Sequence, residues 1–566
     1  KIEIKRLIIS SSNIMSKFEP QDRNYLEWRI EPALDKLKNF DPVQAKALVG
    51  DEIDADELGY MLVNSSPYRT MQSIPGILVY SGRTYGRDKD KMIYKCIPND
   101  RQLPMFVISY KEKDTTFNKI KVNKFILFKF VDWDGKHPKG CITNKLGDVT
   151  NTSVFYSYQL FCKKIHNPIQ KFTKVVSRAI RKPNKKYDDL FENREDMYVI
   201  TIDPEGTADF DDALGITELS NGSTIVSVYI ANVVYWMDAL DLWEHFTERI
   251  TTIYLPNGKH PMLPNILGDG LCSLNVRNKR YTLAMDITIN KDSELESVEF
   301  NLCTINVKVN YIYEEDVLLM DDTYIKLLSL AKTLNKESNY IDKIEDSHDI
   351  VAFYMLVMNH KSAQVLNREN KGIFRSVVCK DKNNIQAPDE IRQFVSYWKN
   401  VSGSYTNCTD QQGHALVGGG LECYLQITSP IRRMIDLINM VELQSIICNY
   451  RVSAKTQEFI NKWMNQIPFI NEKMKAVQKV QNDCALLDRC IKLRKELNEV
   501  IIEGFVIDKE RDKEKNKYTI HVPKLKLTNW IYVDNTLEMY KKYKFSLHSF
   551  IDEATLKKKV RLQFHE

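Results

Sequence analysis

An acidic run placed directly after an apolar strand constrains this chain more than any other feature. Residues 197–202, Met-Tyr-Val-Ile-Thr-Ile, are typical of a buried β-strand that ends at Asp203 and Pro204. Five of the ten residues at 203–212, Asp-Pro-Glu-Gly-Thr-Ala-Asp-Phe-Asp-Asp, are acidic and none is basic. Phe210 and the apolar residues on both sides predict that this loop packs against a core.

Carboxylates held this close together repel one another, and a divalent cation would relieve the repulsion. The run contains neither His nor Cys, and carboxylate oxygens favour Mg²⁺ or Mn²⁺ over Zn²⁺. Two such ions about 4 Å apart would suit in-line displacement at phosphorus. Acidic loops are common, so the run indicates catalysis only together with a phosphate-binding partner.

The candidate partner is Ile-Thr-Ser-Pro-Ile-Arg-Arg at 427–433. We expect Ser429 to cap a helix and the following proline to take its first position. Arg432 and Arg433 then fall in the first turn, where the helix dipole disfavours cations. A bound phosphate would compensate for this, with Asp436 orienting Arg432. An ordinary helix pair between Arg432 and Asp436 is the alternative.

The two motifs resemble the signatures of the ribonuclease II/ribonuclease R family, whose catalytic domain is the RNB domain. Four shorter segments between them recur in the family's order: Val-Tyr-Ile-Ala-Asn-Val at 228–233, Tyr-Leu-Pro at 254–256, Pro-Met-Leu-Pro at 261–264 and Leu-Cys-Ser-Leu at 271–274. Segments 76–103 and 128–140 further resemble the cold-shock barrel of the eukaryotic exosome-type members. The resemblance covers roughly residues 74 to 566.

The fold implied by the resemblance is multidomain α+β, a mixed α/β RNB domain flanked by small OB-fold β-barrels. Short β-rich runs after residue 74 and after residue 499 favour barrels on their own. The expected domains are a partly helical N-terminal region at 1–73, a cold-shock-like barrel at 74–165, a basic linker at 166–190, the RNB domain at 191–493 and an S1-like barrel at 494–566. The helix at the N-terminus is predicted from the near-3.6 spacing of Leu26, Trp28, Ile30, Leu34 and Leu37.

Two further features could bind a nucleic acid. Nine basic residues and no acidic one lie between Lys163 and Lys186, which indicates either a solvated linker or a segment that follows phosphates. The first barrel offers aromatic and basic residues for one face, although these are also ordinary strand formers. They are Tyr80, Arg83, Tyr85, Lys91, Tyr94 and Lys95.

The resemblance also implies roles for individual residues. Asp203, Asp209, Asp211 and Asp212 match the catalytic, metal-holding aspartates, and Asp211 should matter most for chemistry. Arg432 matches the arginine that holds the scissile phosphate. The substrate-binding residues are Tyr254 on the 3′-terminal base, Tyr313 near the same nucleotide, Asn359, and Arg433 beside the phosphate. A buried structural role remains the alternative for both tyrosines and for Asn359.

The activity implied is processive hydrolysis of single-stranded RNA from the 3′ end to nucleoside 5′-monophosphates, with Mg²⁺ as cofactor and Mn²⁺ as the alternative ion. The chain departs from frequent family residues at Tyr229, Asn232, Met440 and Gln481. These departures favour a second hypothesis, a catalytically weak or inactive RNB-fold protein that binds RNA or acts as a scaffold. A metal-dependent phosphatase or deoxyribonuclease is a third, which leaves both barrels unexplained.

Composition sets the remaining expectations. The 80 basic and 75 acidic residues give a net charge of +5, which permits an anionic partner without demanding one. No apolar run reaches membrane-spanning length, and the 11 cysteines include no C-x-x-C pair. We therefore expect no membrane partner and a reducing intracellular location, the cytoplasm first. The isolated chain is expected to be a monomer, and the resemblance allows a larger RNA-decay complex.

Overall fold

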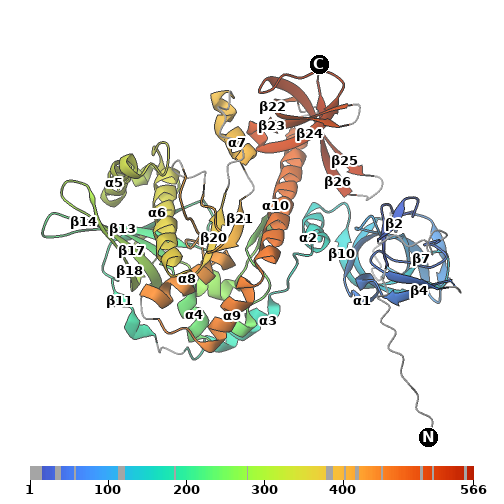
Figure 1. Ribbon diagram of the computed structural model, residues 1–566, viewed down its shortest axis with the longest axis horizontal. Helices are drawn as coiled ribbons and strands as arrows, with labels where there is room; N and C mark the ends of the chain where they lie inside the picture. The colour runs from blue at the N-terminus through green and yellow to red at the C-terminus, as the bar shows by residue number, and fades with distance from the viewer. Residues whose placement is uncertain are drawn as a thin grey trace, which may run out of the picture. The chain divides into compact units, whose positions relative to one another are not determined.

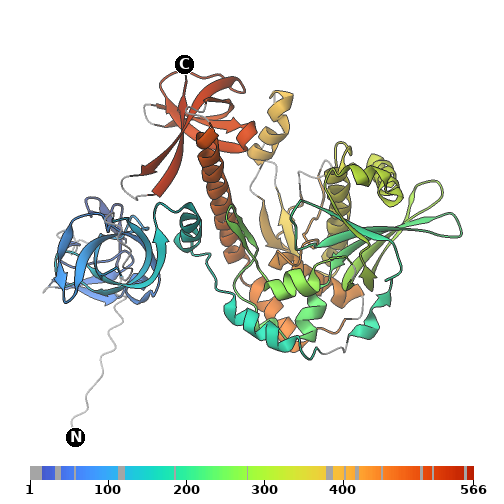
Figure 2. The same ribbon diagram turned by 180° about the vertical axis from the view of Figure 1, so that it is seen from behind.

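The computed structural model describes residues 16–31, 40–56, 59–112, 121–183, 187–276, 278–377, 387–400, 403–414, 420–447, 450–496, 501–512, 515–552 and 557–565. The chain divides into two compact units, shown from two sides in Figures 1 and 2. The first unit comprises Lys1–His166, Asp483–Ile501 and Ser546–Gln563. The second comprises Asn167–Asn482, Ile502–Phe545 and Phe564–Glu566.

The first unit begins with an antiparallel sheet where the sequence predicted a helix. Its strands are β1 (Ser16–Pro20), β2 (Trp28–Glu31), β3 (Glu52–Asp56) and β4 (Gly59–Asn64), in the order β2-β1-β3-β4. The helical prediction is wrong at Trp28 and Ile30, because Ile30 is buried by the two-residue alternation of a strand and its strand partner is the buried Phe18. Leu34 and Leu37 lie outside the described residues. One short helix, α1 (Pro67–Thr70), follows the sheet.

A closed barrel comes next and confirms the predicted small β-barrel. Its strands are β5 (Ile74–Leu78), β6 (Thr84–Asp88), β7 (Lys91–Pro98), β8 (Phe106–Tyr110), β9 (Lys124–Asp132) and β10 (Lys139–Asp148). They run β5-β9-β10-β8-β7-β6, and a further pairing of β5 with β7 closes five strands on themselves. A Cβ at Gly76 or Gly140 would lie 2.9 Å from the Phe128 ring. Glycine at both positions therefore leaves room for this ring in the barrel interior. Helix α2 (Thr152–Cys162) follows the barrel.

The aromatic face predicted on this barrel is only partly available to a ligand. Tyr94 is buried, and its ring packs edge-on against Tyr80 with centroids 5.0 Å apart. Tyr85 is exposed, and the guanidinium of Arg83 lies 5.6 Å from its ring centroid. One part of the predicted face therefore belongs to the barrel core.

The segment predicted as a basic linker contains a packed helix. Helix α3 (Gln170–Ala179) buries Phe172 and Val176 in the core of the second unit. Its basic residues Lys171, Lys174 and Arg178 are exposed on the other side. The sequence interpretation missed the apolar positions spaced four apart within the run of charge.

A seven-stranded sheet forms the centre of the second unit. Its strands are β11 (Glu192–Asn193), β12 (Val199–Asp203), β13 (Asp212–Glu218), β14 (Thr224–Ala231), β17 (Lys279–Ile289), β18 (Leu295–Asn306) and β19 (Val309–Ile312). Their order is β11-β18-β17-β14-β13-β12-β19, with parallel pairing only at the two edges. Two further antiparallel pairs lie outside this sheet: β15 (Ile253–Leu255) with β16 (Gly258–His260), and β20 (Ile373–Ser376) with β21 (Ser404–Asn407).

The helices of the α/β region are α4 (Val233–Ala239), α5 (Asp322–Ser338), α6 (Ser347–Arg368), α7 (Asp389–Asn400), α8 (Met434–Ile447), α9 (Ala454–Met464) and α10 (Ile467–Glu496), with short 3₁₀ or π segments η2 (Asp188–Leu190), η3 (Trp243–His245), η4 (Ile266–Cys272) and η5 (Asp316–Met320). Helix α7 packs against Phe505 and Ile507 of the C-terminal strands. Helix α8 is buried from Met434 to Gln444 and contacts both α4 and α6, as Figure 1 shows. Among the helices in the described ranges, none is long and apolar enough to cross a membrane.

The C-terminal strands form a five-stranded sheet in the order β24-β23-β22-β25-β26. They are β22 (Ile501–Asp512), β23 (Lys515–Val522), β24 (Leu527–Val533), β25 (Lys542–Asp552) and β26 (Lys557–Phe564), with the turn η6 (Pro523–Leu525) after β23. Tyr518 and Ile520 are buried on the inner face of β23. A five-stranded sheet therefore follows the α/β region in the chain, where the sequence predicted short β-rich runs.

Candidate active site

The acidic run connects two neighbouring antiparallel strands of the central sheet. Strand β12 ends at Asp203, β13 begins at Asp212, and the two pair through Ile200 and Leu214. Hydrogen bonds hold the loop against the body of the unit: the Ser273 hydroxyl donates to the Ala208 carbonyl at 2.8 Å and accepts from the Phe210 amide at 2.9 Å. The loop thus packs against the core, as its sequence predicted.

Burial makes the carboxylates of this loop difficult to ionise together. Asp211 is 2% exposed and Asp212 is 9% exposed. Burial raises the pKa of Asp211 to about 8. It also raises the pKa of Asp203, with further contributions from Asp212 and Asp211, and it raises the pKa of Asp212. Several groups that would normally be anions are therefore forced close together.

Arg432, near the end of the second motif, reaches this loop. Its Nε lies 3.1 Å from Asp211 Oδ2, and the backbone N–H of Ile431 donates to Asp211 Oδ1 at 2.9 Å. The Arg432 side chain is nevertheless 45% exposed, with Nη2 donating to the Ser429 hydroxyl at 3.0 Å. The structure thus brings together the two motifs that the sequence predicted to act as one site.

The helix after the arginines begins later than the sequence predicted. Helix α8 starts at Met434, so Arg432 and Arg433 lie in the preceding turn, outside its first turn. Asp436 bonds Arg433, at 2.9 and 2.7 Å, and accepts from the Ser429 N–H at 2.8 Å. The predicted pairing of Asp436 with Arg432 is therefore wrong, because Arg433 takes that carboxylate and Arg432 is free to reach Asp211.

Tyr254 lies on strand β15 with an exposed ring. The side chain is 45% exposed, so the alternative of a satisfied core tyrosine does not hold. Its backbone N–H donates to Gln481 Oε1 at 2.8 Å, and its hydroxyl lies 3.5 Å from Asp209 Oδ2. Gln481, which entered as a departure from the family, thus holds the Tyr254 strand to helix α10.

Tyr313 and Asn359 are placed differently. Tyr313 follows β19, its N–H donates to the Asp203 carbonyl at 3.1 Å, and its ring stacks on His348 at 3.7 Å. Burial, Asp212 and Asp203 raise its pKa. Asn359 is buried, and its amide donates to Tyr424 and accepts from the Ile427 N–H. The side-chain NH₂ group and carbonyl oxygen of Asn359 both bond to other protein groups, so Asn359 positions the start of the second motif at Ile427.

Most of the departures lie in the core. Tyr229 and Met440 are buried, and Asn232 caps helix α4 by accepting from the Tyr235 N–H at 3.0 Å. None of these three residues lines the cavity described next.

A cavity of about 410 Å³ opens beside Arg432 and Tyr254. Four cationic side chains line it, namely Arg375, Arg432, Arg433 and Lys475. Sequence reasoning missed Arg375 and Lys475, because neither belongs to a motif and only the fold brings them to the arginine turn. The cavity therefore combines positive charge for phosphates with an exposed aromatic ring.

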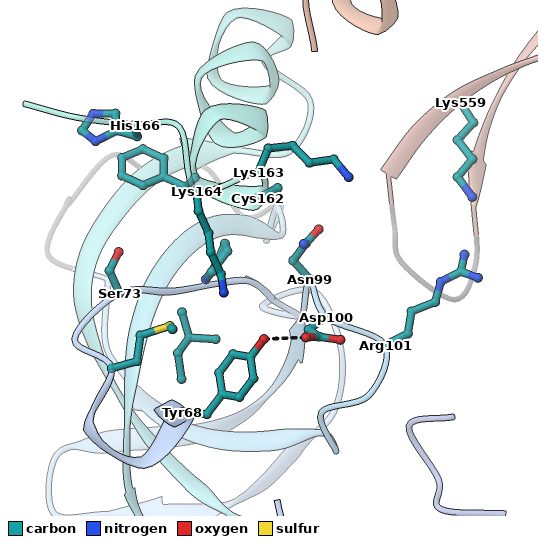
Figure 3. Close-up of a pocket in the computed structure, with 14 residues that line it drawn as sticks. Tyr68, Ser73, Asn99, Asp100, Arg101, Cys162, Lys163, Lys164, His166 and Lys559 are labelled. Atoms are coloured by element: carbon teal, nitrogen blue, oxygen red, sulfur yellow. Dashed lines mark hydrogen bonds between the residues drawn. The ribbon is translucent and has the colours of Figure 1, made fainter. Parts of the chain in front are cut away.

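A second cavity, of about 700 Å³, lies in the first unit and contains none of the predicted catalytic residues. Figure 3 shows Arg101, Lys163, Lys164 and Lys559 around it, with Tyr68 donating to Asp100 at 2.5 Å. Lys163 and Lys164 open the basic segment recognised in the sequence. This cavity could accept a phosphate backbone.

The acidic loop suits a hard cation by its chemistry. Its donors are carboxylate oxygens, and Asp203 Oδ2 is buried without a hydrogen-bond partner. The described residues nonetheless contain no group of three or more His, Cys, Asp or Glu side chains already arranged around a metal position. The loop therefore fits a divalent ion in donor type and charge, while its carboxylates are held partly by protein cations.

Lys259 is one of these cations, and the sequence gave no sign of it. Its Nζ lies 2.8 Å from Asp209 Oδ1 and 3.0 Å from Asp269 Oδ1. Burial alone would lower the pKa of Lys259, and the bonds to Asp209 and Asp269 outweigh it and raise the pKa. Knowledge of the β15–β16 pairing would have been needed to place this residue.

The sequence is similar to a family model and to known proteins. The family model for the RNB domain matches residues 191–324. Exosome complex exonuclease RRP44 of Mus musculus is 26% identical over 347 residues, covering 56% of this chain and 35% of that protein. Ribonuclease R of Thermotoga maritima is 29% identical over 194 residues, covering 33% of this chain and 27% of that protein. The matches thus span about a third of these relatives' lengths.

Solved structures share the fold. The structure of Mycoplasma genitalium RNase R in complex with ribose-methylated single-stranded RNA has a TM-score of 0.71 at 15% identity, covering 97% of this chain and all of that one. Yeast Ssd1, described as a pseudonuclease, has a TM-score of 0.59 at 15% identity, covering 85% of this chain and 68% of that one. The predicted fold class, a mixed α/β RNB domain with barrels on both sides of it, is confirmed.

Proposed function

Because residues 191–324 match the family model for the RNB domain, we propose that this chain is a processive 3′-to-5′ exoribonuclease of the ribonuclease II/ribonuclease R family. It hydrolyses single-stranded RNA and releases nucleoside 5′-monophosphates. The observation that carries the proposal is the ion pair of Arg432 with Asp211 at 3.1 Å, at the edge of a cationic cavity that also exposes Tyr254. The acidic loop and the phosphate-binding turn meet there.

The acidic loop that carries Asp203, Asp209, Asp211 and Asp212 would hold a divalent ion, Mg²⁺ or alternatively Mn²⁺. When bound, the ion supplies an activated water and charge neutralisation at the phosphate. The buried, unpartnered Asp203 Oδ2 and the raised pKa of Asp211 support this assignment, since a cation there removes the cost of burying carboxylates.

Arg432 orients the scissile phosphate. Its guanidinium is fixed at one end by Ser429, while 45% of the side chain stays exposed toward the cavity. A planar, always charged fork suits two phosphate oxygens. Arg433, bonded to Asp436, adds positive field without the same freedom to move.

Tyr254 and Tyr313 hold the terminal nucleotide. The exposed ring of Tyr254 can stack on any base, which gives binding without sequence preference. Tyr313 is fixed by His348 and by its bond to the Asp203 carbonyl, so it can contact the same nucleotide from the sheet side. Asn359 acts as a positioning residue, because it orders residues 424–427 behind the arginine turn.

The rest of the chain supplies binding to upstream RNA and sets the partners. The cationic cavity of Figure 3 would hold the backbone of single-stranded RNA. A larger RNA-decay complex is proposed from the exosome relatives, with the isolated chain a monomer. The cysteine content suits a reducing cytoplasmic location.

A catalytically inactive RNA-binding protein is the second candidate function. The likeness to Ssd1, a pseudonuclease by its description, favours it, as do the departures from the family. The pairing of Asp211 with Arg432, in place of a metal ion, is also compatible with an inactive site.

Release of the 3′-terminal nucleotide separates the two. A single-stranded RNA labelled at its 3′-terminal phosphodiester should yield labelled nucleoside 5′-monophosphate before any other labelled product, as followed by thin-layer chromatography with Mg²⁺. Labelled RNA that binds but stays intact would establish the inactive protein. Internal fragments appearing first would exclude exonucleolytic action.

A further inference from the structure

The β15–β16 pair places Lys259 directly opposite Tyr254. The register joins Ile253 with His260, Tyr254 with Lys259, and Leu255 with Gly258. Cross-strand partners carry their side chains on the same face of the sheet. The tips of Tyr254 and Lys259 accordingly meet the same carboxylate, Asp209.

Both oxygens of Asp209 face this strand pair. Oδ1 accepts from Lys259 Nζ at 2.8 Å, and Oδ2 lies 3.5 Å from the Tyr254 hydroxyl. Lys259 also bonds Asp269 Oδ1 at 3.0 Å, so its ammonium is fixed between η4 and the acidic loop. The contacts leave Asp209 little freedom to turn toward the other aspartates.

This bridge is shielded from solvent. The side chains of Lys259 and Asp269 are each 23% exposed, and that of Asp209 is 11% exposed. Ion pairs in such places are screened less than surface pairs, and removing one partner leaves the other charge uncompensated. Lys259 therefore acts at the site more strongly than a surface lysine could.

The other three aspartates are in different surroundings. Asp211 is paired with Arg432, which the proposed function assigns to the RNA phosphate. Asp203 keeps a buried oxygen without a hydrogen-bond partner, and Asp212 lies beside it in the same loop. Three carboxylates suffice for one Mg²⁺, which usually takes one or two together with water and substrate phosphate.

We propose that Lys259 is a positioning residue that serves as a built-in cation at the acidic loop. Its ammonium group holds Asp209 and keeps the β15–β16 pair, which carries Tyr254, in contact with the loop. With Asp209 held in this way, the loop binds one divalent ion, whereas four free aspartates would bind two. The inference rests on the proposed function, because that function assigns the loop to a divalent ion.

Counting bound ions tests this without measuring activity. Mn²⁺ is titrated into the full-length chain, and free Mn²⁺ is followed by electron paramagnetic resonance at fixed pH. The variants are Lys259→Met, which removes the charge at similar length, Lys259→Gln as a second neutral variant, and Lys259→Arg, which restores the cation. Lys279→Met is the matched control, since Lys279 forms an ion pair with Glu195 at 3.0 Å away from the loop.

We expect one tightly bound Mn²⁺ per chain in the wild type, in Lys259→Arg and in Lys279→Met. Lys259→Met and Lys259→Gln should bind two, or bind the first at least about tenfold more tightly, because a positive charge within bonding distance has been removed. The neutral variants should also bind RNA with a fluorescent 3′-terminal 2-aminopurine more weakly, because Tyr254 is less well docked.

Two Mn²⁺ ions in the wild type, or neutral variants with wild-type number and affinity, would overturn the role of Lys259 and leave the proposed nuclease intact. Absence of Mn²⁺ binding in every protein, with and without RNA, would overturn the metal-dependent function and this inference together. Equal changes in Lys279→Met would mark the effect as general electrostatics and overturn the inference alone.

Discussion

The proposed function gives Asp211 the largest part in the chemistry. This residue is buried, accepts the Ile431 N–H, and is paired with Arg432, so its position is fixed from two sides. Such a carboxylate is expensive to bury as an anion unless a cation compensates it. A nearby cation therefore lowers the free-energy cost of burying the Asp211 carboxylate. Under the proposed function, Mg²⁺ would supply this positive charge when Arg432 binds the phosphate.

The burial of these carboxylates predicts how stability depends on pH. Burial raises the pKa of Asp211 to about 8 from an ordinary 3.8. The folded state then holds more protons than the unfolded state between these values, so stability falls as pH rises from about 5 to about 8. Without divalent ions, the melting temperature should fall over this window, and Mg²⁺ should raise it more at pH 8 than at pH 5. Asp211→Asn should flatten the slope, and a melting temperature that rises with pH would contradict the assignment.

Arg432 should affect rate more than affinity. Arg432→Ala should lower kcat by about 10²–10³-fold, because one preorganised charge at the phosphate is lost. The Kd for RNA should change far less, since Arg375, Arg433 and Lys475 remain in the cavity. Single-turnover kinetics and fluorescence anisotropy measure the two quantities. Lys326→Ala, in a surface ion pair with Glu218, is the control, and a lost affinity with normal turnover would contradict the role.

At the residue scale, the site residues that could be predicted from the sequence are those within the two motifs. Asp203, Asp211 and Arg432 stand in two short runs, and the fold needs only to bring those runs into contact. Lys259 and Asp269 could not be found this way, because their bridge depends on the register of a three-residue strand pair. Arg375 joins the cavity through a strand pairing distant from both motifs.

At the scale of secondary structure, helix α8 organises the site. The buried Asn439 donates to the carbonyls of Ile373 and Gln426 and accepts from the Ile373 N–H, so one side chain ties strand β20 to the segment before the arginines. Because these backbone groups of Ile373 and Gln426 are buried, water could not take the place of the Asn439 side-chain amide.

Asn439→Leu should therefore lower the free energy of unfolding by about 2–4 kcal/mol, since it leaves buried backbone groups unpaired. Urea denaturation followed by circular dichroism measures it. Asn461→Ala, in an exposed pair with Gln457 on α9, should change stability by less than about 0.5 kcal/mol. Equal effects of the two substitutions would exclude the bridging role.

Three elements differ from their sequence prediction for identifiable reasons. Helix α8 begins after the arginines because Asp436 caps the turn that contains them. Strand β2 forms where a helix was predicted, because pairing with β1 fixes an extended backbone in which buried residues alternate every two positions. Helix α3 was not predicted, because its buried residues Phe172 and Val176 are only two positions within a run of basic residues. In each case, a tertiary contact outweighed the local pattern.

At the scale of the whole molecule, the cavity lined by Arg101, Lys163, Lys164 and Lys559 predicts a second RNA-binding site that does not depend on RNA sequence. The double variant Lys163→Ala and Lys164→Ala should weaken binding equally for RNAs of different sequence, and lower the slope of log Kd against log salt by about 1–2. Turnover at saturating RNA should not change. Lys111→Ala, in a surface pair with Asp90, is the control, and a salt slope equal to that of the wild type would remove this cavity from the RNA path.

The most direct test of the proposed exoribonuclease is a time course on a 5′-labelled single-stranded RNA 30-mer with Mg²⁺. It is run beside the Asp211→Asn variant and a DNA of the same sequence. The proposal predicts that the RNA shortens to a very short final product, that Asp211→Asn binds the RNA and leaves it whole, and that the DNA persists. Intact RNA with shifted mobility in the wild type would contradict it and identify a protein that keeps this fold for binding alone.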